Sequence, residues 1–554
     1  MMSLELRIRD RLLRLYPDHD CFSILDSCLE AVGPPLTDSS ETKWSERDAL
    51  LICYPDQLTE DGSSPLSTLK SALGEIDDGF SIVHVLPFFP SSSDGGFAII
   101  DHLEVAENLG NWSQISSISS NMRVMADLVL NHVSWSHRWV KQFVDDVEPG
   151  RSCIRTILPD EDLSNVARPR TSELSLPCET AGGSQELWCT FGHDQVDVDW
   201  RTPEVLYETL RVIDRLIAEG IRWIRLDAVA YVYKKSGTSC VHLEETHELV
   251  KLLRDFLSLR CPQAVLITET NVPHSENLSY LRDHEQAHVA YNFSLAPLLA
   301  FAFLFGSSTK LVTWLKEAEQ PPPGTTLLNF LASHDGIGLR PVEGLLTDAD
   351  LSKFIEQVET AGGTWSGRSV GEITKPYEIN VALPSLLGQE RLLTAHTLLA
   401  SIRGLPAFYF PAIEGEPNDL KSMAILGENR GINRPKKTVL NRQAALSEES
   451  RSKRDELVRR LNVRRQLPAF HPEAEQSMID LDSPLIGFTR GTGSNAITVI
   501  ANLGFDEVRY EVSKQSFDVL SGQTLSGQIY IRPSEILWLS TIDNKSAQRP
   551  GASL

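Results

Sequence analysis

Three acidic residues in this chain follow apolar runs of the kind that form buried strands. They are Asp227, Glu269 and Asp335, which follow the runs 221–226, 264–268 and 327–334. Arg225 lies two residues before Asp227, so both side chains leave an extended strand on the same face. A structural Arg–Asp pair at a strand end is the alternative for this motif alone. Three carboxylates at three strand ends instead predict one site at the mouth of a (β/α)8 barrel.

Carboxyl groups arranged in this way can cleave a glycosidic bond. With retention, one carboxylate acts as the nucleophile and a carboxylic acid about 5 Å away protonates the leaving group. We expect Asp227 to be the nucleophile, because a neighbouring guanidinium such as Arg225 lowers a carboxyl pKa and keeps it ionised. Glu269 has no basic neighbour in sequence and is expected to stay protonated as the acid. Asp335 is expected to bind sugar hydroxyls and to stabilise positive charge at the anomeric carbon.

Composition limits the class of protein and its partners. The 554 residues are 41% hydrophobic and 23% charged, as in a soluble globular protein, and the net charge of −23 argues against nucleic acids and anionic membranes as partners. The segment 295–305 is too short to span a bilayer, and the N-terminus lacks the apolar stretch of a signal peptide. Eight cysteines without a CxxC pair indicate reduced thiols. We therefore expect a cytoplasmic protein.

Alternating strand and helix patterns predict a parallel α/β sheet with appended segments. The predicted barrel strands lie near residues 50–54, 82–86, 123–129, 221–227, 264–268, 288–292, 327–334 and 405–410. We expect a helical extension at 1–48, a catalytic barrel formed by 49–133, 201–335 and 387–468, inserted subdomains at 134–200 and 336–386, and a β domain at 469–545. Both insertions are predicted to be irregular, and the last dozen residues to be disordered.

Four short motifs together resemble the signature strand ends of the α-amylase superfamily. They are Val129–His132, Arg225–Val229, Glu269 and His334–Asp335. The sucrose phosphorylase branch is similar to this chain at Asp94–His102, Arg168–Arg170, Gln195–Asp197 and His334–Gly338. Residues 269–274 look more like those of glucosylglycerol and glucosylglycerate phosphorylases, because sucrose phosphorylases carry a histidine where this chain has Asn271. The resemblance does not explain the N-terminal extension.

The resemblance implies a set of substrate-binding side chains around the three carboxylates. Those carried over to the sugar subsite are Asp94, Phe97, His132, His334 and Arg434. Phe191 and Gln195 are placed on the acceptor side, and Arg225 and Asn271 complete the set of substrate-binding residues. Phosphate ligands are implied at Arg170 in the first insertion and Tyr377 in the second, since arginine binds phosphate in a bidentate manner.

The sequence favours a retaining α-glucoside phosphorylase without a cofactor, in which inorganic phosphate is a co-substrate. We find no glycine-rich phosphate loop and no metal-ligand spacing, so neither nucleotide nor metal is expected. The expected partners are a small glucoside, phosphate and a polyol acceptor. The favoured glucoside is 2-O-α-glucosylglycerol, followed by glucosylglycerate, then sucrose or sucrose 6′-phosphate. A hydrolase or transglucosidase of short α-glucosides is the second candidate function, and a catalytically inactive sugar-binding scaffold is the third. Oligomeric state is left open.

Overall fold

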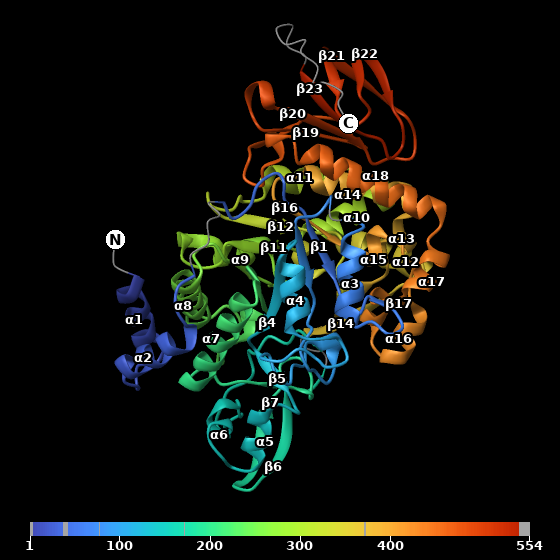
Figure 1. Ribbon diagram of the computed structural model, residues 1–554. Helices are drawn as coiled ribbons and strands as arrows, with labels where there is room; N and C mark the ends of the chain where they lie inside the picture. The colour runs from blue at the N-terminus through green and yellow to red at the C-terminus, as the bar shows by residue number, and fades with distance from the viewer. Residues whose placement is uncertain (1–3, 37–41, 77, 171, 371–372, 542–554) are drawn as a thin grey trace.

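The centre of the molecule is a closed barrel of eight parallel strands (Figure 1). The computed structural model describes residues 4–36, 42–76, 78–170, 172–370 and 373–541. In chain order, the barrel strands are β1 (Leu50–Cys53), β3 (Ile82–Val85), β4 (Arg123–Val129), β9 (Trp223–Asp227), β10 (Val265–Thr268), β11 (Val289–Asn292), β12 (Thr326–Asn329) and β16 (Leu405–Tyr409). Each pairs with its chain-order neighbour among these strands, and β16 closes the ring against β1. The predicted (β/α)8 fold is confirmed.

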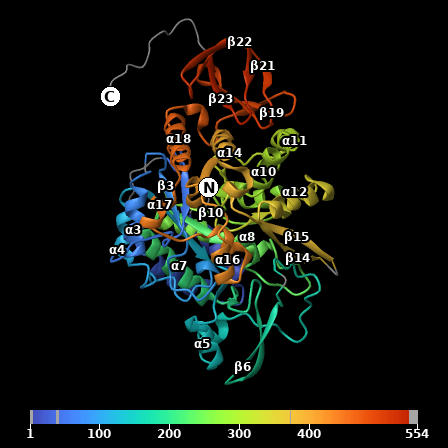
Figure 2. The ribbon, with the colours of Figure 1, turned by 90° about the vertical axis from the view of Figure 1, so that its right-hand side faces the viewer.

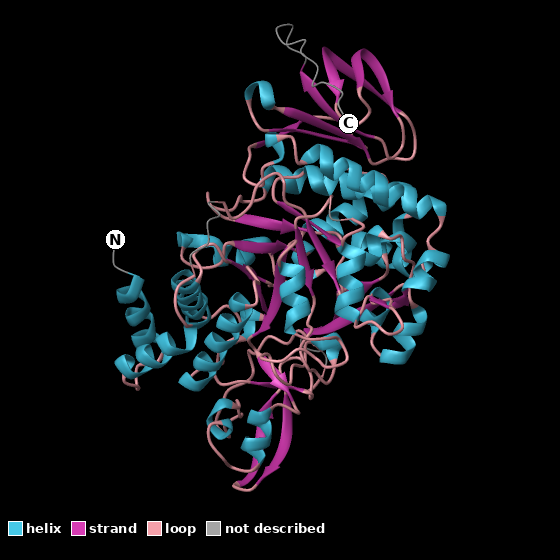
Figure 3. Cartoon of the chain, viewed as in Figure 1, coloured by secondary structure: helices cyan, strands magenta, loops and turns pink. Residues whose placement is uncertain are grey.

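Helices surround the barrel and cover the outer face of its strands (Figure 3). They include α3 (Pro65–Leu73), α4 (Trp112–Ser119), α7 (Pro203–Ala218), α8 (Glu244–Arg260), α9 (His274–Leu278), α10 (Leu295–Phe305), α11 (Thr309–Glu317), α13 (Leu383–Leu387), α14 (Gln389–Ser401), α15 (Phe410–Ile413) and α18 (Glu448–Arg464). The strands are buried on both faces, which explains their nearly continuous apolar sequences. Within the described ranges, no helix combines enough length and apolarity to cross a bilayer.

The seventh barrel strand is shorter than its apolar sequence predicts. Strand β12 ends at Asn329, so Asp335 lies in the loop that follows and not at the strand end itself. Asn329 faces Pro406 of β16, and proline has no N–H with which to continue the ladder. The prediction that Asp335 directly ends a strand is therefore wrong, although the loop still delivers it to the barrel mouth.

The first insertion is more regular than its sequence suggests. It contains β5 (His132–Ser134), α5 (Arg138–Val144), α6 (Gly150–Cys153), β6 (Ser175–Thr180), β7 (Gly183–Trp188) and β8 (Gln195–Asp197). Strands β6 and β7 form a hairpin that extends away from the barrel (Figure 1). Strand β8 returns to pair with β5, with Ser134 opposite Gln195. This pairing places the end of the insertion beside the mouth of the barrel.

The second insertion also contains regular structure. Strands β13 (Ile337–Gly338), β14 (Thr364–Val370) and β15 (Ile373–Asn380) form an antiparallel sheet in the order β13-β15-β14, and α12 (Asp348–Thr360) connects two of them. Figure 2 shows β14 and β15 on one flank of the barrel. Thr347 and Asp350 form a capping box at the start of α12. This local N-terminal signal in the sequence could have predicted the helix.

The C-terminal domain lies at the opposite end of the molecule from the first insertion (Figure 1). It is one antiparallel sheet in the order β18-β19-β20-β23-β21-β22. Its strands are β18 (Gln476–Ile479), β19 (Leu485–Arg490), β20 (Ile497–Asn502), β21 (Val508–Asp518), β22 (Gln523–Ile531) and β23 (Ile536–Thr541). Trp538 is buried and donates a hydrogen bond to Ser401 of α14. The predicted disorder of the last dozen residues concerns a segment outside the described residues.

Two N-terminal helices, α1 (Leu4–Leu15) and α2 (Cys21–Val32), pack on the outside of α8 and α7 (Figure 1). Ile8, Leu12 and Leu15 form the buried face of α1, as their helical spacing predicts. Arg11 lies on the same face and is only 5% exposed. Its guanidinium contacts Asp255 (2.9 Å) and Glu248 (3.2 Å) of α8, and Glu285 (2.8 Å). An ion-pair cluster therefore fixes the extension to the barrel.

Replacing Arg11 with methionine should loosen the N-terminal helices without affecting the barrel. Removing one partner of a buried ion pair costs about 3 kcal/mol, which corresponds to roughly 100-fold more frequent opening. We expect faster limited proteolysis within residues 1–48 and unchanged turnover of the intact enzyme. Arg14→Met is the matched control, because Arg14 is exposed and mainly pairs with Asp10 within its own helix. Equal proteolysis of both variants would contradict this account.

Candidate active site

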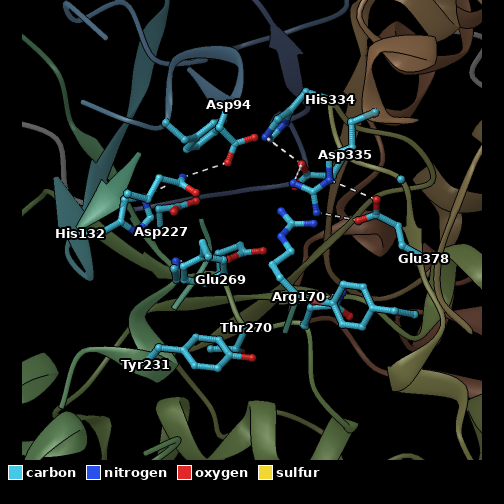
Figure 4. Close-up of a pocket in the computed structure, with 18 of the residues that line it drawn as sticks. Asp94, His132, Arg170, Asp227, Tyr231, Glu269, Thr270, His334, Asp335 and Glu378 are labelled. Carbon is cyan, nitrogen blue, oxygen red and sulfur yellow. Dashed lines mark hydrogen bonds and ion pairs between the residues drawn. The ribbon is translucent and has the colours of Figure 1, made fainter. Parts of the chain in front are cut away.

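The carboxyl ends of the barrel strands open into one cavity (Figure 4). Its walls combine carboxylates, arginines, histidines and aromatic rings. They are Asp94, Phe97, His132, Arg170, Phe191, Gln195, Asp227, Ala228, Tyr231, Glu269, Thr270, Asn271, Phe293, His334, Asp335, Gly336, Tyr377, Glu378 and Arg430. The three carboxylates singled out in the sequence all reach this cavity.

Asp227 is fixed by a buried ion-pair chain that begins inside the barrel. The Arg225 guanidinium, 2% exposed, donates to Asp227 Oδ1 at 2.6 Å and to Asp127 Oδ1 on the neighbouring strand β4. Asp127 in turn lies 2.8 Å from His84 Nε2 on β3. Burial opposes ionisation of Asp127, but His84 and Arg225 lower its pKa to about 2. The chain therefore holds a charged guanidinium directly behind Asp227.

Glu269 lies beside Asp227 because of the backbone turn after β9. Ala228 adopts a left-handed conformation (φ 52°), and its N–H donates to Glu269 Oε2 at 3.3 Å. The same guanidinium that binds Asp227 places its Nη2 at 3.7 Å from Glu269 Oε1. Two carboxyl groups from adjacent strands therefore share one arginine. Such a left-handed non-glycine residue is uncommon and is often found at functional sites.

Burial dominates the ionisation of this pair. It raises the pKa of Asp227 to about 8, while Arg225 lowers it and the adjacent Glu269 raises it. Burial also raises the pKa of Glu269, against the opposing effect of Arg225. The sequence analysis predicted a net lowering for Asp227, and that prediction was wrong because desolvation outweighs the guanidinium. Since Arg225 is nearer to Asp227, it favours the shared negative charge there and the proton on Glu269.

Asp335 faces the other carboxylates across the cavity (Figure 4) and has a different charge environment. Arg430 Nη1 lies 2.5 Å from Asp335 Oδ1, His334 Nε2 lies at 3.5 Å, and Arg434 Nη2 lies at 3.6 Å. Burial opposes ionisation of Asp335, but Arg430, His334 and Arg434 hold its pKa well below the usual range. Asp335 is therefore an anion at neutral pH, next to a pair of carboxyl groups whose pKa values are raised by burial.

Neutral polar groups and one flat ring line the side of the cavity near Asp94. Gln195 Nε2 donates to Asp94 Oδ2 at 3.0 Å and lies 3.0 Å from His132 Nε2. Phe97 stacks on the ring of His334, with centroids 5.0 Å apart. Burial lowers the pKa of His334 to about 3 and also lowers the pKa of His132, so both rings are neutral at pH 7. This combination suits a sugar ring with hydroxyls at its edge.

The opposite side of the cavity has the character of an anion site. Arg170 lines it and has neither an ion pair nor a hydrogen-bonded partner among the residues that the structure describes. Asn271 Nδ2 donates to the Tyr377 hydroxyl at 3.4 Å, which joins the loop after β10 to the second insertion. Phe191 lies between the two sides, against the rings of Tyr231 (5.4 Å) and His132 (5.3 Å). An unpaired guanidinium beside two neutral donors can bind a phosphate or a carboxylate.

Most side chains predicted from the sequence meet in this cavity, with three differences in position. Arg225 was grouped with the substrate-binding residues but lies behind the wall, enclosed by carboxylates and by the rings of Phe97 and Tyr291. Arg434 also lies outside the lining, where its Nε donates to His334 O. Gln195 lines the cavity, where it contacts Asp94 and His132, two residues that the resemblance places in the sugar subsite. These three residues orient neighbouring side chains of the site.

The sequence analysis missed several residues of the wall. They are Ala228, Tyr231, Thr270, Phe293, Gly336, Glu378 and Arg430. Four of them could have been predicted because each directly follows a predicted site residue. Ala228, Thr270 and Gly336 follow the three acidic residues, and Glu378 follows Tyr377. Arg430 lies four residues before Arg434, in a short 3-10 helix that ends at Asn433. Within the described parts of the chain, no group of three or more His, Cys, Asp and Glu side chains is arranged to hold a metal ion.

Several proteins are similar to this chain in sequence or in fold. The Alpha-amylase family profile, described as alpha amylase, catalytic domain, matches residues 73–336. A glucosylglycerate phosphorylase of Allomeiothermus silvanus is 36% identical over 90% of this chain and 92% of its own length. A glucosylglycerol phosphorylase of Marinobacter adhaerens is 26% identical over 69% and 80% of the two chains. The crystal structure of sucrose 6F-phosphate phosphorylase from Thermoanaerobacter thermosaccharolyticum shares the fold, with a TM-score of 0.74, 24% identity, and coverage of 89% and 99%.

Proposed function

The chain belongs to the α-amylase family, in its branch of sucrose-, glucosylglycerate- and glucosylglycerol-type phosphorylases, and we propose that its own reaction is the reversible phosphorolysis of glucosylglycerate. The products are α-glucose 1-phosphate and glycerate. The observation that carries phosphorolysis over hydrolysis is Arg170, an unpaired guanidinium in the wall of the catalytic cavity. Water needs no cation at this position, whereas a phosphate dianion does.

In the first half of the reaction, Asp227 attacks the anomeric carbon while Glu269 gives its proton to the departing glycerate oxygen. This step breaks the glycosidic bond and forms a glucosyl ester on Asp227. Arg225 orients the attacking carboxylate through its 2.6 Å hydrogen bond. Asp335, held ionised by the guanidinium groups of Arg430 and Arg434, stabilises positive charge on the sugar in the transition state.

In the second half, phosphate replaces glycerate at the anion side of the cavity. A phosphate oxygen attacks the anomeric carbon, Asp227 leaves as a carboxylate, and Glu269 recovers its proton from hydrogen phosphate. Two inversions at the same carbon give retention of the α configuration. Arg170 and the Tyr377 hydroxyl are the proposed phosphate ligands, because both face this side of the cavity and neither is neutralised by a carboxylate.

Glycerate replaces glycerol as the proposed acceptor, which reverses the preference drawn from the sequence alone. The glucosylglycerate phosphorylase relative is more similar and matches more of the chain than the glucosylglycerol phosphorylase relative. A chemical argument supports the same choice. Glycerate and phosphate are both anions that occupy this side in turn, so the guanidinium of Arg170, which has no ion-pair partner among the described residues, can bind each of them. Glycerol would leave that charge without a partner.

The acceptor is tested by the reverse reaction. Given glucose 1-phosphate and equal concentrations of glycerate, glycerol, fructose or fructose 6-phosphate, the enzyme should release phosphate fastest with glycerate. We expect a preference over glycerol of at least about tenfold, since a charge-assisted hydrogen bond contributes about 1.5–3 kcal/mol. Phosphate release without any acceptor measures background hydrolysis. A preference for glycerol would refute the acceptor and leave the phosphorylase mechanism intact.

The phosphate ligands are tested by comparing two fates of one glucosyl-enzyme. Arg170→Ala and Tyr377→Phe should reduce phosphorolysis of an aryl α-glucoside much more than its hydrolysis, by about 100-fold and tenfold respectively in the ratio of the two rates. Arg168→Ala is the matched control, because Arg168 lies in the same loop outside the cavity lining. A proportional fall in both activities would assign Arg170 and Tyr377 to sugar binding or to structure.

A further inference from the structure

A single arginine joins the sugar side of the cavity to the second insertion. Arg430, in the 3-10 helix η5 (Asn429–Asn433) that follows α16 (Leu420–Leu426), lies 2.5 Å from Asp335 Oδ1 through Nη1. Its other face makes a bidentate contact with Glu378 on β15, with Nε to Oε1 at 3.1 Å and Nη2 to Oε2 at 2.6 Å. Figure 4 draws both contacts as dashed lines that reach Asp335 and Glu378. The guanidinium thus bridges carboxylates from two separate parts of the chain.

The backbone brings the same two segments together. Leu339 N donates to Tyr377 O at 2.8 Å, and Gly338 of β13 pairs with Glu378 of β15. Gly336, the residue after Asp335, is in such close contact that an added Cβ would meet Glu378 Cγ and Ile379 O at 2.5 Å each. Strand β15 therefore packs directly against the loop that carries Asp335. Tyr377, which precedes Glu378, faces the anion side from this strand.

Charge and burial indicate that Arg430 orients neighbouring side chains and does not itself attract phosphate. Glu378 is 2% exposed, and its carboxylate is satisfied by the Arg430 fork. Because two carboxylates already compensate its charge, Arg430 contributes little net positive charge for an incoming phosphate. Instead, the bridge fixes the position of β15 relative to Asp335. Because Tyr377 lies on β15, its position is fixed as well. A planar guanidinium can hold two carboxylates at defined angles, whereas an ammonium group cannot.

We infer that Arg430 and Glu378 are a pair of positioning residues that set the phosphate site in register with the sugar site. The inference rests on the proposed phosphorolysis and extends it to two residues of the cavity wall that bind each other. When the pair is broken, Asp335 and the carboxyl pair still assemble the glucosyl-enzyme. Tyr377 then loses its fixed place, so phosphate competes less well with water.

The test measures phosphorolysis and hydrolysis of one aryl α-glucoside, which makes it independent of the natural acceptor. Glu378→Gln keeps the shape of the side chain and leaves the Arg430–Asp335 contact in place. We expect its KM for phosphate to rise at least about tenfold, and the ratio of phosphorolysis to hydrolysis to fall with it. Arg430→Lys keeps the charge but loses the fork, and should shift the ratio of phosphorolysis to hydrolysis in the same direction.

Glu343→Gln is the matched control, because Glu343 pairs with Arg368 (2.6 Å) in the same insertion but lines no part of the cavity. It should leave the ratio unchanged. Wild-type enzyme that hydrolyses the glucoside but does not use phosphate would refute the proposed function. A different result would refute the positioning role alone. In that case the wild-type enzyme uses phosphate, but Glu378→Gln and Arg430→Lys either keep the wild-type KM for phosphate or lose phosphorolysis and hydrolysis in proportion.

Discussion

Asp227→Ala is expected to lower turnover by at least about three orders of magnitude while the protein keeps its fold. The physical reason is that neither of the other two catalytic carboxyl groups can replace it. Glu269 is needed as the acid, and Asp335 is held by Arg430. The loss should appear in phosphorolysis and hydrolysis alike, because both pass through the same glucosyl ester. Steady-state rates with an activated aryl α-glucoside measure this effect without depending on the acid.

The covalent ester itself can be observed. A fluorinated glucosyl donor that reacts slowly in the second step should leave a glucosyl label on the peptide that contains Asp227, as detected by mass spectrometry. Far-ultraviolet circular dichroism of Asp227→Ala checks that the barrel is intact. A label on another carboxylate, or an Asp227→Ala variant with near-normal turnover, would show that the nucleophile is assigned wrongly.

Glu269→Gln should affect substrates according to their leaving group. Loss of a general acid costs about 10²- to 10⁴-fold for a poor leaving group such as glycerate, and much less for an activated phenol that needs no proton. The pH profile adds a second observation. Burial raises the pKa of Glu269, and the acid works only when protonated, so wild-type activity should fall as pH rises through that pKa.

With activated phenols the fall at high pH should be small in the wild-type enzyme, and in Glu269→Gln it should be absent, since glutamine does not titrate. Asp335→Asn provides the contrast, because Asp335 acts as an anion and its loss should affect both kinds of leaving group. Equal losses with phenol and glycerate leaving groups in Glu269→Gln, or an unchanged high-pH limb, would show that Glu269 is not the acid.

The sequence predicts the position of a catalytic residue well where that residue lies at the end of an apolar strand. Asp227 and Glu269 directly follow buried strands, so a barrel necessarily places them at one mouth. Asp335 reaches the same mouth through a loop, and the apolar residues before it imitate a longer strand. The helix α12 and the hairpin of the first insertion were missed because their apolar positions are few, although the cap at Thr347 was visible.

The environment of the site could not be predicted from sequence, because it depends on contacts between distant segments. Arg225 and Asp227 are two residues apart and form the expected pair. The net pKa shift of Asp227 nevertheless follows burial, which appears only when the barrel closes around it. Arg430 and Glu378 are 52 residues apart, and no periodicity links them. Gln195 joins Asp94 and His132 only because β8 returns to pair with β5.

The most direct test of the account follows both products of phosphorolysis in one experiment. The enzyme is incubated with glucosylglycerate and inorganic phosphate, and proton and phosphorus NMR spectra are recorded over time. The account predicts that α-glucose 1-phosphate and glycerate form at equal rates, with the α anomer as the first phosphorylated product. Formation of free glucose at the rate of glycerate release, or of β-glucose 1-phosphate, would contradict retaining phosphorolysis by this site.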